Sequence, residues 1–377
     1  MSEKQTATAT PCEETARAAV ATEGLEAVTP GSPEAALDLA RNARAGRARG
    51  QPTTILDCAV RQGGWTYTPL WWELVSLMAD PADYRLVRQL WLDSPEECRN
   101  NLSLIRAVAR AACIAGEHEE ARLLLRRAIL LAARRTQRAR TLMGRGKRAV
   151  RRLVSVTKGK PLPRLNAPFD VRAAEALRDL GTATAELGIR PFLISGTLLG
   201  YVRDGAIISW DKDIDVGVFS EECPDDIEGF FNAQDNFDVR RVDLTADRLR
   251  INHKNGVWID LFPHYLEGGL RWHDGTATRW WNKPFSLKTV DFLGCEQFVP
   301  DDPERYLEEN YGRWQVPEPN FDARLDAPNA EITDQEHLDS LLYFSLLAAI
   351  TKGKSRMRER YVALLRARGE GDWLSRA

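Results

Sequence analysis

Long apolar runs are missing from this chain of 377 residues. The longest one in its C-terminal part, residues 341–350, includes Ser345 and is too short to span a bilayer. The N-terminal residues have neither a basic start nor an apolar segment, so no signal peptide is expected. These absences predict a soluble, cytoplasmic protein.

Clusters of cysteine or histidine that could bind a metal or act as nucleophiles are also missing. The six cysteines are scattered without a C-x-x-C pair, which argues against a zinc site or a disulfide framework and fits a reducing compartment. The five histidines lack metal-ligand spacing, and no Cys/His or Ser/His catalytic arrangement is found. There is no G-x-x-x-x-G-K-[ST] loop and no G-x-G-x-x-G. The net charge of −2 gives no general attraction to nucleic acid, and the length predicts two or three domains.

The first part of the chain is expected to be a tail followed by helices. Residues 1–33 are poor in large apolar side chains and are predicted to be disordered. Helical patterns then recur, which predicts a helical domain over residues 34–150. An ordinary helical hairpin with small packing residues explains residues 104–133. The same residues also match the second half of a tetratricopeptide repeat, through Gly116, Ala121, Leu125 and Ala128.

A strongly basic segment follows this helical region. Residues 121–169 hold fifteen Lys or Arg and no Asp or Glu, and residues 151–165 are predicted to be a basic linker. A solvated helix and linker is one explanation. The other is that residues 121–164 contact an anionic partner, either a phosphate-rich or lipid-linked acceptor or, peripherally, the acidic face of a membrane. No specific nucleic-acid partner is expected.

The stretch from residue 191 to 220 organises the remainder of the chain. Residues 192–194 are an apolar run that suits a buried strand. Ser195-Gly196-Thr197 is a turn of small residues, in which backbone N–H groups can approach a ligand closely. A short helix is expected over residues 198–202, and residues 213–218 alternate as a second strand.

Two carboxylates share one face of that second strand. Because side chains alternate along a strand, Asp213 and Asp215 point to the same side. Carboxylates this close repel one another unless a cation lies between them. The expected cation is Mg²⁺, or Mn²⁺ in its place, because Mg²⁺ takes one or two carboxylates and completes its shell with water and phosphate oxygens. A solvated strand face beside a turn is the simpler explanation of the D-x-D pattern taken alone.

A third acid lies in a predicted hairpin. Strand-like residues 247–252 and 257–262 flank Lys254-Asn255-Gly256, and Asn-Gly between two such runs predicts a hairpin. Asp260 has apolar neighbours in the second of these strands, where an acid is costly to bury unless it binds something. An edge position that faces water is the alternative.

Residues 166–330 have the composition of one compact domain. An aromatic-rich β-meander is predicted over residues 270–300, and residues 331–377 are predicted to form C-terminal helices. Most aromatic side chains of the meander are expected in the core or in a groove wall. One or two could instead stack on a cytosine or enclose a quaternary ammonium group.

Four motifs stand in this domain. Residues 196–203 read G-T-L-L-G-Y-V-R, residues 210–215 W-D-K-D-I-D, residues 259–263 I-D-L-F-P and residues 306–314 Y-L-E-E-N-Y-G-R-W. Over roughly residues 170–325 they resemble the LicD/fukutin-related family of phospho-group transferases, whose patterns are G-T-L-L-G-x-x-R, W-D-x-D-[IV]-D, an acid followed by an apolar-Phe-Pro run, and Y-L-x-x-x-Y-G-x-x-W. The last motif follows its pattern as far as Gly312, with Trp314 one position earlier. Many bacterial members have an Asp at the position of Lys212, so the local charge differs here.

The resemblance implies an α+β fold, in which a nucleotidyltransferase-type mixed sheet follows an all-α domain. It also implies a metal-dependent enzyme that moves a phosphorylated small group, of the phosphocholine or phospho-alditol type, from a CDP-activated donor to a glycan hydroxyl and releases CMP. The metal would be held by Asp213, Asp215 and Asp260, with Asp260 or Asp211 as the catalytic base. Donor phosphates would be bound by Ser195, Gly196, Thr197 and Arg203.

Two other functions fit the same sequence. The fold and its carboxylates also serve nucleotidyltransferases that add AMP to a small molecule or protein, although the motif wording fits these less well. A non-catalytic helical-repeat adaptor with a degenerate transferase domain is the third hypothesis. Loss of an acid would have favoured it, and Asp213, Asp215 and Asp260 are all present.

Overall fold

The computed structural model describes residues 32–44, 48–145, 168–241 and 246–376. The predicted linker at residues 151–165 lies outside the described residues, as does the predicted tail except for its last two residues. The chain divides into two compact units, Met1–Leu124 and Leu125–Ala377. The division falls inside one long helix.

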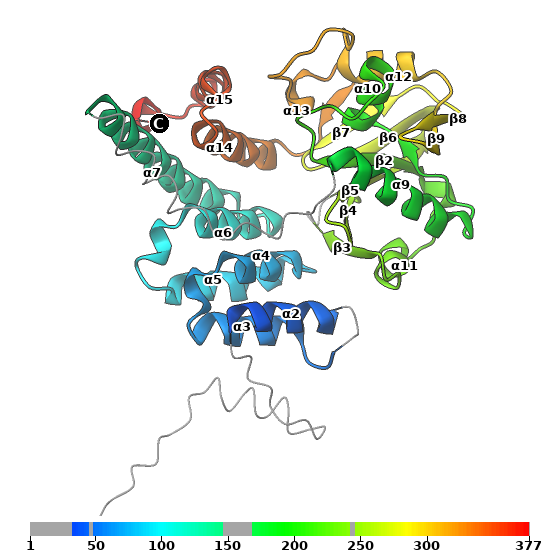
Figure 1. The fold of residues 1–377 in the computed structure, drawn as a ribbon. Coiled ribbons are helices and arrows are strands. Elements are labelled where there is room, and N and C mark those ends of the chain that lie inside the picture. The colour runs from blue at the N-terminus through cyan, green and yellow to red at the C-terminus, as the bar shows by residue number, and fades with distance from the viewer. Residues whose placement is uncertain (1–31, 45–47, 146–167, 242–245, 377) are drawn as a thin grey trace, which may run out of the picture. The chain divides into compact units, whose positions relative to one another are not determined.

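Helices are the regular structure of the first unit over its described residues (Figure 1). Helix α2 packs against α3, and α4 against α6. Large buried side chains such as Trp71 and Leu104 form its interior. The side chain of Asn101 caps α6 by accepting hydrogen bonds from the backbone N–H groups of the first turn. The helices are α2 (Pro33–Arg44), α3 (Pro52–Arg61), α4 (Thr68–Ser76), α5 (Tyr84–Asp93), α6 (Leu102–Ile114) and the start of α7 (His118–Arg145).

The predicted hairpin over residues 104–133 consists of α6 and the first half of α7. Gly116 adopts a φ of 79° between the two helices, a left-handed conformation that glycine reaches without strain. Ala121 and Ala128 are fully buried, as small packing residues should be. Two consecutive helices joined by a short turn are therefore confirmed over these residues, and their packing as a hairpin and their tetratricopeptide character stay predictions.

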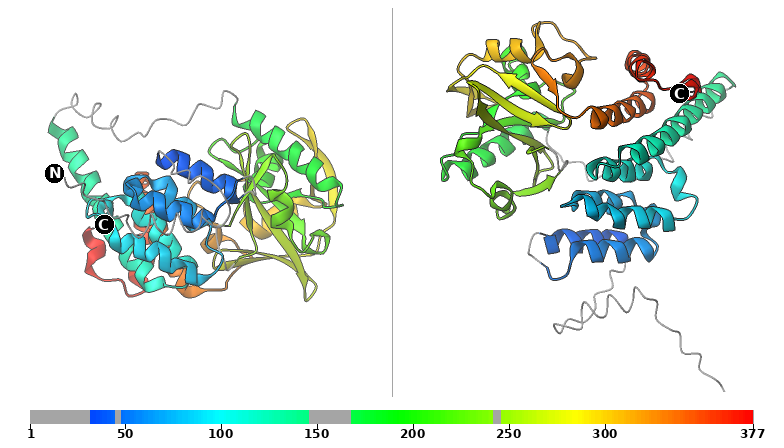
Figure 2. Two further views of the ribbon diagram at one scale, coloured as in Figure 1. Left: turned by 90° about the horizontal axis from the view of Figure 1, so that it is seen from below. Right: turned by 180° about the vertical axis from the view of Figure 1, so that it is seen from behind.

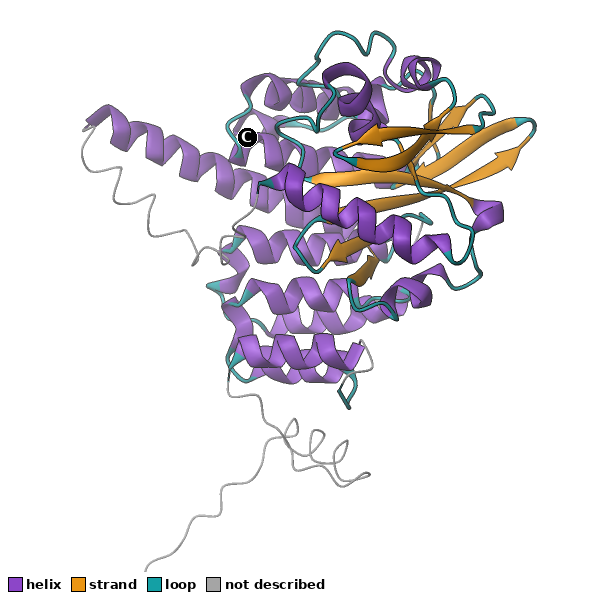
Figure 3. Ribbon diagram, turned by 45° about the vertical axis from the view of Figure 1, so that its right-hand side comes forward, coloured by secondary structure: helices purple, strands orange, loops and turns teal. Residues whose placement is uncertain are grey.

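The second unit contains one twisted, mixed β-sheet (Figures 2 and 3). The strand order is β10-β7-β6-β5-β2-β1-β9-β8, and β4 pairs with both β3 and β5. Strand β2 runs parallel to β5, and β1 runs parallel to β9. The strands are β1 (Phe192–Leu193), β2 (Asp213–Phe219), β3 (Phe237–Arg241), β4 (Leu249–His253), β5 (Trp258–Glu267), β6 (Leu270–Gly275), β7 (Thr278–Asn282), β8 (Leu287–Phe292), β9 (Cys295–Pro300) and β10 (Ala330–Ile332).

Helices supply the rest of this unit and cover the apolar side chains of the sheet. Leu177 and Leu180 of α9 and Phe231 of α11 belong to the same buried cluster as Ile214 and Ile259 of the central strands. The central strands alternate, so their other face is left to polar side chains. The helices are α9 (Phe169–Ala185), α10 (Ser195–Asp204), α11 (Ile227–Asn232), α12 (Pro303–Tyr311), α13 (Ala323–Asp326), α14 (Gln335–Thr351) and α15 (Ser355–Ala367).

This architecture confirms a helical N-terminal region followed by a mixed-sheet domain, and it is consistent with a nucleotidyltransferase-like fold. Among the described residues, none of the helices is both long enough and apolar enough to cross a membrane.

Candidate active site

The turn predicted at Ser195-Gly196-Thr197 is already helical. Helix α10 begins at Ser195, not at Leu198, so the expected turn and short helix are one continuous element. Ser195 has a φ of 47°, which is rare for a residue with a side chain. The chain needs this conformation because it passes directly from the buried strand β1 into the helix.

The start of α10 holds Asp215 in place. The backbone N–H of Gly196 donates a hydrogen bond to Oδ2 of Asp215 over 3.2 Å. The hydroxyl Oγ1 of Thr197 accepts one from the backbone N–H of Asp215 over 2.9 Å. Gly196 and Thr197 were predicted to donate hydrogen bonds to a bound phosphate. In the structure both residues form hydrogen bonds with Asp215.

Strand pairing brings the three predicted metal ligands to one face of the sheet. Asp213 and Asp215 alternate along β2, and the parallel register places Asp215 directly beside Asp260 of β5. Neighbouring residues of adjacent strands point to the same side. The structure therefore brings together the three carboxylates that the sequence pattern selected.

Asp211 completes this group from the segment just before β2. Its Oδ2 lies 2.6 Å from the point where a Cβ on Gly196 would stand, and Oδ2 of Asp215 lies 3.6 Å from the same point. Both carboxylates therefore lie against the first turn of α10, where a Cβ on residue 196 would have to displace Asp211.

Burial and repulsion from neighbouring carboxylates raise the pKa of Asp211, Asp215 and Asp260. Removal from water, followed by the negative charge of Asp213, raises the pKa of Asp211 to about 7. Removal from water also raises the pKa of Asp215 well above its ordinary value, and the charges of Asp260, Asp213 and Asp211 add to this. The pKa of Asp260 is raised by burial, although Arg248 and Arg250 act against it. The cluster thus favours a bound cation or a proton.

Asp260 is the most deeply buried of the acids and lacks a full set of partners. Its residue is 5% exposed, and its Oδ1 accepts no hydrogen bond from any residue that the structure describes. Arg250 Nε lies 3.7 Å from Oδ1, and Arg248 Nη1 lies 3.8 Å from Oδ2, both beyond hydrogen-bond range. A buried carboxylate oxygen without a partner is costly. Carboxylate ligands and this unsatisfied oxygen fit a divalent metal ion.

Arg203 lies at the last turn of α10 with its guanidinium already paired. Its Nε and Nη2 donate to the two carboxylate oxygens of Asp204 over 3.0 and 2.9 Å. Asp204 is the more exposed partner, with 42% of its side chain accessible against 11% for Arg203. Burial raises the pKa of Tyr311 and the charges of Asp215 and Asp211 add to this, while the charge of Arg203 acts against it.

Three residues of this region were missed by the sequence predictions. Arg250 lies opposite Asp260 in the β4–β5 hairpin, and Nη2 of Arg250 donates to Asp213 Oδ2 over 3.2 Å. Arg248 is its neighbour on the same side. The turn at Asn255-Gly256 fixes this register, so the position of Arg250 could have been derived from the hairpin. The third residue, Tyr311, belongs to the α12 motif, and that motif gave no sign that Tyr311 would feel the charges of the acids.

The aromatic side chains of the predicted meander have different environments. Phe285 and Phe292 are buried in the core. The ring of Trp272 is stacked with Tyr265 at 4.5 Å and is covered by the Arg279 guanidinium at 3.6 Å. Both faces of this tryptophan are therefore occupied by protein groups.

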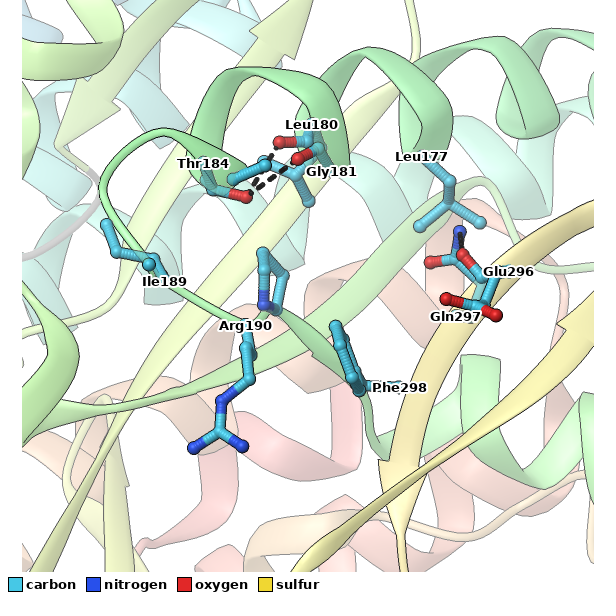
Figure 4. Close-up of a pocket in the computed structure, with 12 residues that line it drawn as sticks. Leu177, Leu180, Gly181, Thr184, Ile189, Arg190, Glu296, Gln297 and Phe298 are labelled. Atoms are coloured by element: carbon cyan, nitrogen blue, oxygen red, sulfur yellow. Dashed lines mark hydrogen bonds between the residues drawn. The ribbon is translucent and has the colours of Figure 1, made fainter.

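A cavity of about 300 Å³ lies elsewhere in the unit, at the C-terminal end of α9 (Figure 4). Leu177, Leu180, Ile189 and Phe298 supply apolar walls. Arg190, at its edge, donates to Glu222 over 3.0 Å. The lining residues include none of the predicted site residues, so this cavity is separate from the acidic cluster.

Comparison with known proteins identifies the region that contains the cluster. Residues 188–302 match the family model described as LicD/FKTN/FKRP, nucleotidyltransferase domain. The matched range contains all eight predicted site residues. The resemblance inferred from the motifs is confirmed.

Curated relatives align over the same part of the chain. The protein named Ribitol-5-phosphate transferase FKTN from Mus musculus is 31% identical over 172 residues, which cover 43% of this chain and 37% of the relative. The Homo sapiens protein of that name is 29% identical over the same length. The Homo sapiens protein named Ribitol 5-phosphate transferase FKRP is 26% identical over 148 residues, or 36% of this chain and 30% of the relative. The chain thus matches between 30% and 37% of the length of these relatives.

Proposed function

We propose, from the match of residues 188–302 to the LicD/FKTN/FKRP domain, that this protein is a metal-dependent phospho-group transferase. It would move a phosphorylated small group from a CDP-activated donor to a glycan hydroxyl and release CMP. The relatives are named as ribitol-5-phosphate transferases, which favours a phospho-alditol group such as ribitol phosphate over phosphocholine.

The proposal rests mainly on one observation: Asp213, Asp215 and Asp260 lie on one face of the sheet, beside the start of α10. Phosphoryl transfer needs little covalent help from a protein and depends on positioning and neutralising phosphate charge. The three carboxylates would hold Mg²⁺ or Mn²⁺, which would polarise the phosphate oxygens when bound. The unsatisfied Oδ1 of Asp260 supports this assignment.

The remaining residues have roles that follow from their positions. The glycan hydroxyl oxygen would form a bond to the donor's outer phosphorus, and the bond from that phosphorus to the CMP oxygen would break. Asp211 or Asp260 would accept the proton of the hydroxyl, and the raised pKa of Asp211, about 7, suits a base that works near neutral pH. Gly196 and Thr197 would keep Asp215 aimed at the site.

Trp210 is the candidate for contact with the cytosine. It directly precedes Asp211 and is 63% exposed, which is unusual for a tryptophan. Replacing Trp210 by Ala should raise KM for the donor roughly tenfold, the range of one base–aromatic stacking contact, and leave kcat nearly unchanged. Trp210→Phe keeps a ring and should restore most of the affinity. An unchanged KM in Trp210→Ala would remove this residue from the donor site.

Arg203 is proposed to exchange Asp204 for a donor phosphate. Arg203→Lys keeps the charge and loses the two-pronged donor geometry, so turnover should fall roughly tenfold. Asp204→Asn removes the competing carboxylate and should tighten donor binding. If Arg203→Lys lowers the melting temperature and leaves turnover intact, the pair with Asp204 is structural.

A panel of donors tests the proposal. The protein is incubated with Mg²⁺, an acceptor glycan and, in turn, CDP-ribitol, CDP-glycerol, CDP-choline or ATP, and the released nucleotide is identified. CMP released from a CDP donor is the expected result. Consumption of ATP with transfer of AMP would support the alternative function. No turnover of any donor would favour the non-catalytic adaptor.

Three wider predictions remain proposals. A cytoplasmic location rests on the scattered cysteines. The anionic-partner or membrane-surface role of residues 121–164 concerns a segment of which residues 146–164 lie outside the described part of the chain. Tetratricopeptide character would make the helical unit a protein-binding module.

A further inference from the structure

We propose that Arg250 is a phosphate-binding residue that exchanges between the carboxylates of the site and a phosphate group of the donor. The proposal rests on the proposed function for the identity of the donor, and on the geometry of β4 for the residue itself. On this proposal, Arg250 competes with a divalent cation for the carboxylates and also attracts the diphosphate of the donor.

The sheet places Arg250 in line with the acids. Register partners join Asp215 of β2 to Asp260 of β5, Asp260 to Arg250 of β4, and Arg250 to Arg240 of β3. Cross-strand partners share a face, so this row presents two acids and then two cations on the polar side of the sheet. A dianionic group bound at the acids through a metal would have Arg250 as its next neighbour.

The contacts of Arg250 are loose enough to be exchanged. Among the described residues, Asp213 is the one carboxylate that accepts a hydrogen bond from Arg250, at 3.2 Å. The distance to Asp260 Oδ1 is 3.7 Å, beyond a hydrogen bond. The side chain is 30% exposed and lies over the ring of Trp258 at 5.1 Å. A guanidinium has five N–H groups, so Arg250 keeps donors that a phosphate could use.

Arg250 and a divalent cation would compete for the same carboxylates, so metal binding would favour release of Arg250 from them. A divalent cation beside Asp213 and Asp260 would neutralise the charge that holds Arg250 and would repel its guanidinium. The diphosphate brings new negative charge to the same place. Arginine binds phosphate oxygens in pairs, which makes it well suited to this contact.

Arg248 and Arg240 differ from Arg250 in ways that make them useful comparisons. Arg248 lies over the Phe262 ring, and its Nη1 lies 3.8 Å from Asp260 Oδ2. Arg240 lies one strand farther along the row and has its own acid, with Nε donating to Asp238 over 2.9 Å. Arg240→Gln therefore removes one cation from the same face without touching the catalytic acids.

Two binding measurements on purified full-length protein test the proposal. The first titrates Mn²⁺ into wild type, Arg250→Gln, Arg250→Lys and Arg240→Gln by calorimetry. The second titrates inorganic pyrophosphate and, separately, CDP in saturating Mn²⁺. A matched melting temperature and circular dichroism spectrum verify that each variant is folded.

The expected effects of Arg250→Gln have opposite signs. Mn²⁺ should bind roughly two- to fivefold more tightly, the range of one partly exposed ion pair. Pyrophosphate and CDP should bind roughly 10- to 100-fold more weakly, as expected for the loss of one or two charge-assisted hydrogen bonds. Arg250→Lys should be intermediate, and Arg240→Gln should resemble wild type.

Other outcomes separate this proposal from the proposed function. If wild type binds pyrophosphate but not CDP, and Arg250→Gln loses the pyrophosphate, Arg250 is confirmed as a phosphate-binding residue and the CDP donor is wrong. Equal losses in Arg240→Gln and Arg250→Gln would indicate a general charge effect and overturn the proposal. The proposal would also be overturned if wild type bound neither pyrophosphate nor CDP. It would be overturned as well if Arg250→Gln bound Mn²⁺ less tightly than wild type, or bound pyrophosphate and CDP as tightly as wild type does.

Discussion

Replacing Asp215 by Asn should lower the rate of group transfer by roughly 10²-fold or more and, without metal, should make the protein more stable. The rate falls because one charge of the metal site is lost, and a preorganised electrostatic contact contributes on this scale. The Asn side-chain oxygen can still accept the hydrogen bond from the Gly196 N–H, so the local fold is preserved. Stability rises because a carboxylate that is surrounded by three others no longer has to be accommodated.

The stabilisation should depend on pH with a definite sign. The pKa of Asp215 is raised in the folded protein, so its ionised form costs stability above the ordinary carboxyl range. Below about pH 4, where an ordinary Asp is protonated in both states, the cost disappears. The difference in free energy of unfolding between Asp215→Asn and wild type should therefore be largest near neutral pH and vanish in acid.

Chemical denaturation at several pH values in a metal chelator measures this difference. Asp238→Asn is the matched control, because Asp238 lies on the same polar face of the sheet and pairs with Arg240 outside the cluster. That control should retain activity. An Asp215→Asn variant with wild-type turnover in saturating Mg²⁺ would remove Asp215 from the site.

Replacing Gly196 by Ala should damage activity without unfolding the protein. The added Cβ would stand 2.6 Å from Asp211 Oδ2, closer than a Cβ atom approaches a non-bonded oxygen. The carboxylate is the free end of a side chain and can move, so the fold survives and the acid is displaced. A misplacement of about 1 Å in a catalytic group costs on the order of 10²-fold in rate.

Gly181→Ala provides the control for this change. Gly181 lies within α9 and has no atoms within 4 Å of an added Cβ. Alanine in an open helical position stabilises by about 0.5–1 kcal/mol and should leave turnover unchanged. Melting temperature and kcat, measured on both variants, separate loss of fold from loss of site. If Gly196→Ala keeps full turnover, Asp211 has no role near that glycine.

Local patterns were sufficient to predict much of the site. The alternation of residues 213–218 places Asp213 and Asp215 on one face, as observed along β2. The Asn-Gly turn predicted the β4–β5 hairpin, in which Gly256 adopts a φ of 82°. The strand alternation and the Asn-Gly turn each depend only on residues close together in the sequence, so both can be recognised from the sequence alone.

Other features depend on contacts between distant residues and could not be derived from such patterns. The pairing of β2 with β5 puts Asp215 beside Asp260, 45 positions along the chain, and no periodicity specifies which strands will be neighbours. The start of α10 at Ser195 depends on the sharp exit from β1, and the sequence alone favoured a start at Leu198. The pairing of Arg203 with the adjacent Asp204 is a choice of side-chain conformation that the local sequence leaves open.

The most direct measurement is CMP release from CDP-ribitol in the presence of an acceptor glycan, with Mg²⁺ and again with a chelator. Wild type should release CMP in step with product formation in Mg²⁺ and stop in the chelator. Asp215→Asn should be inactive under both conditions, and Asp238→Asn should behave as wild type. Equal CMP release by wild type with and without the metal, or by Asp215→Asn in Mg²⁺, would contradict a metal-dependent transferase built on these carboxylates.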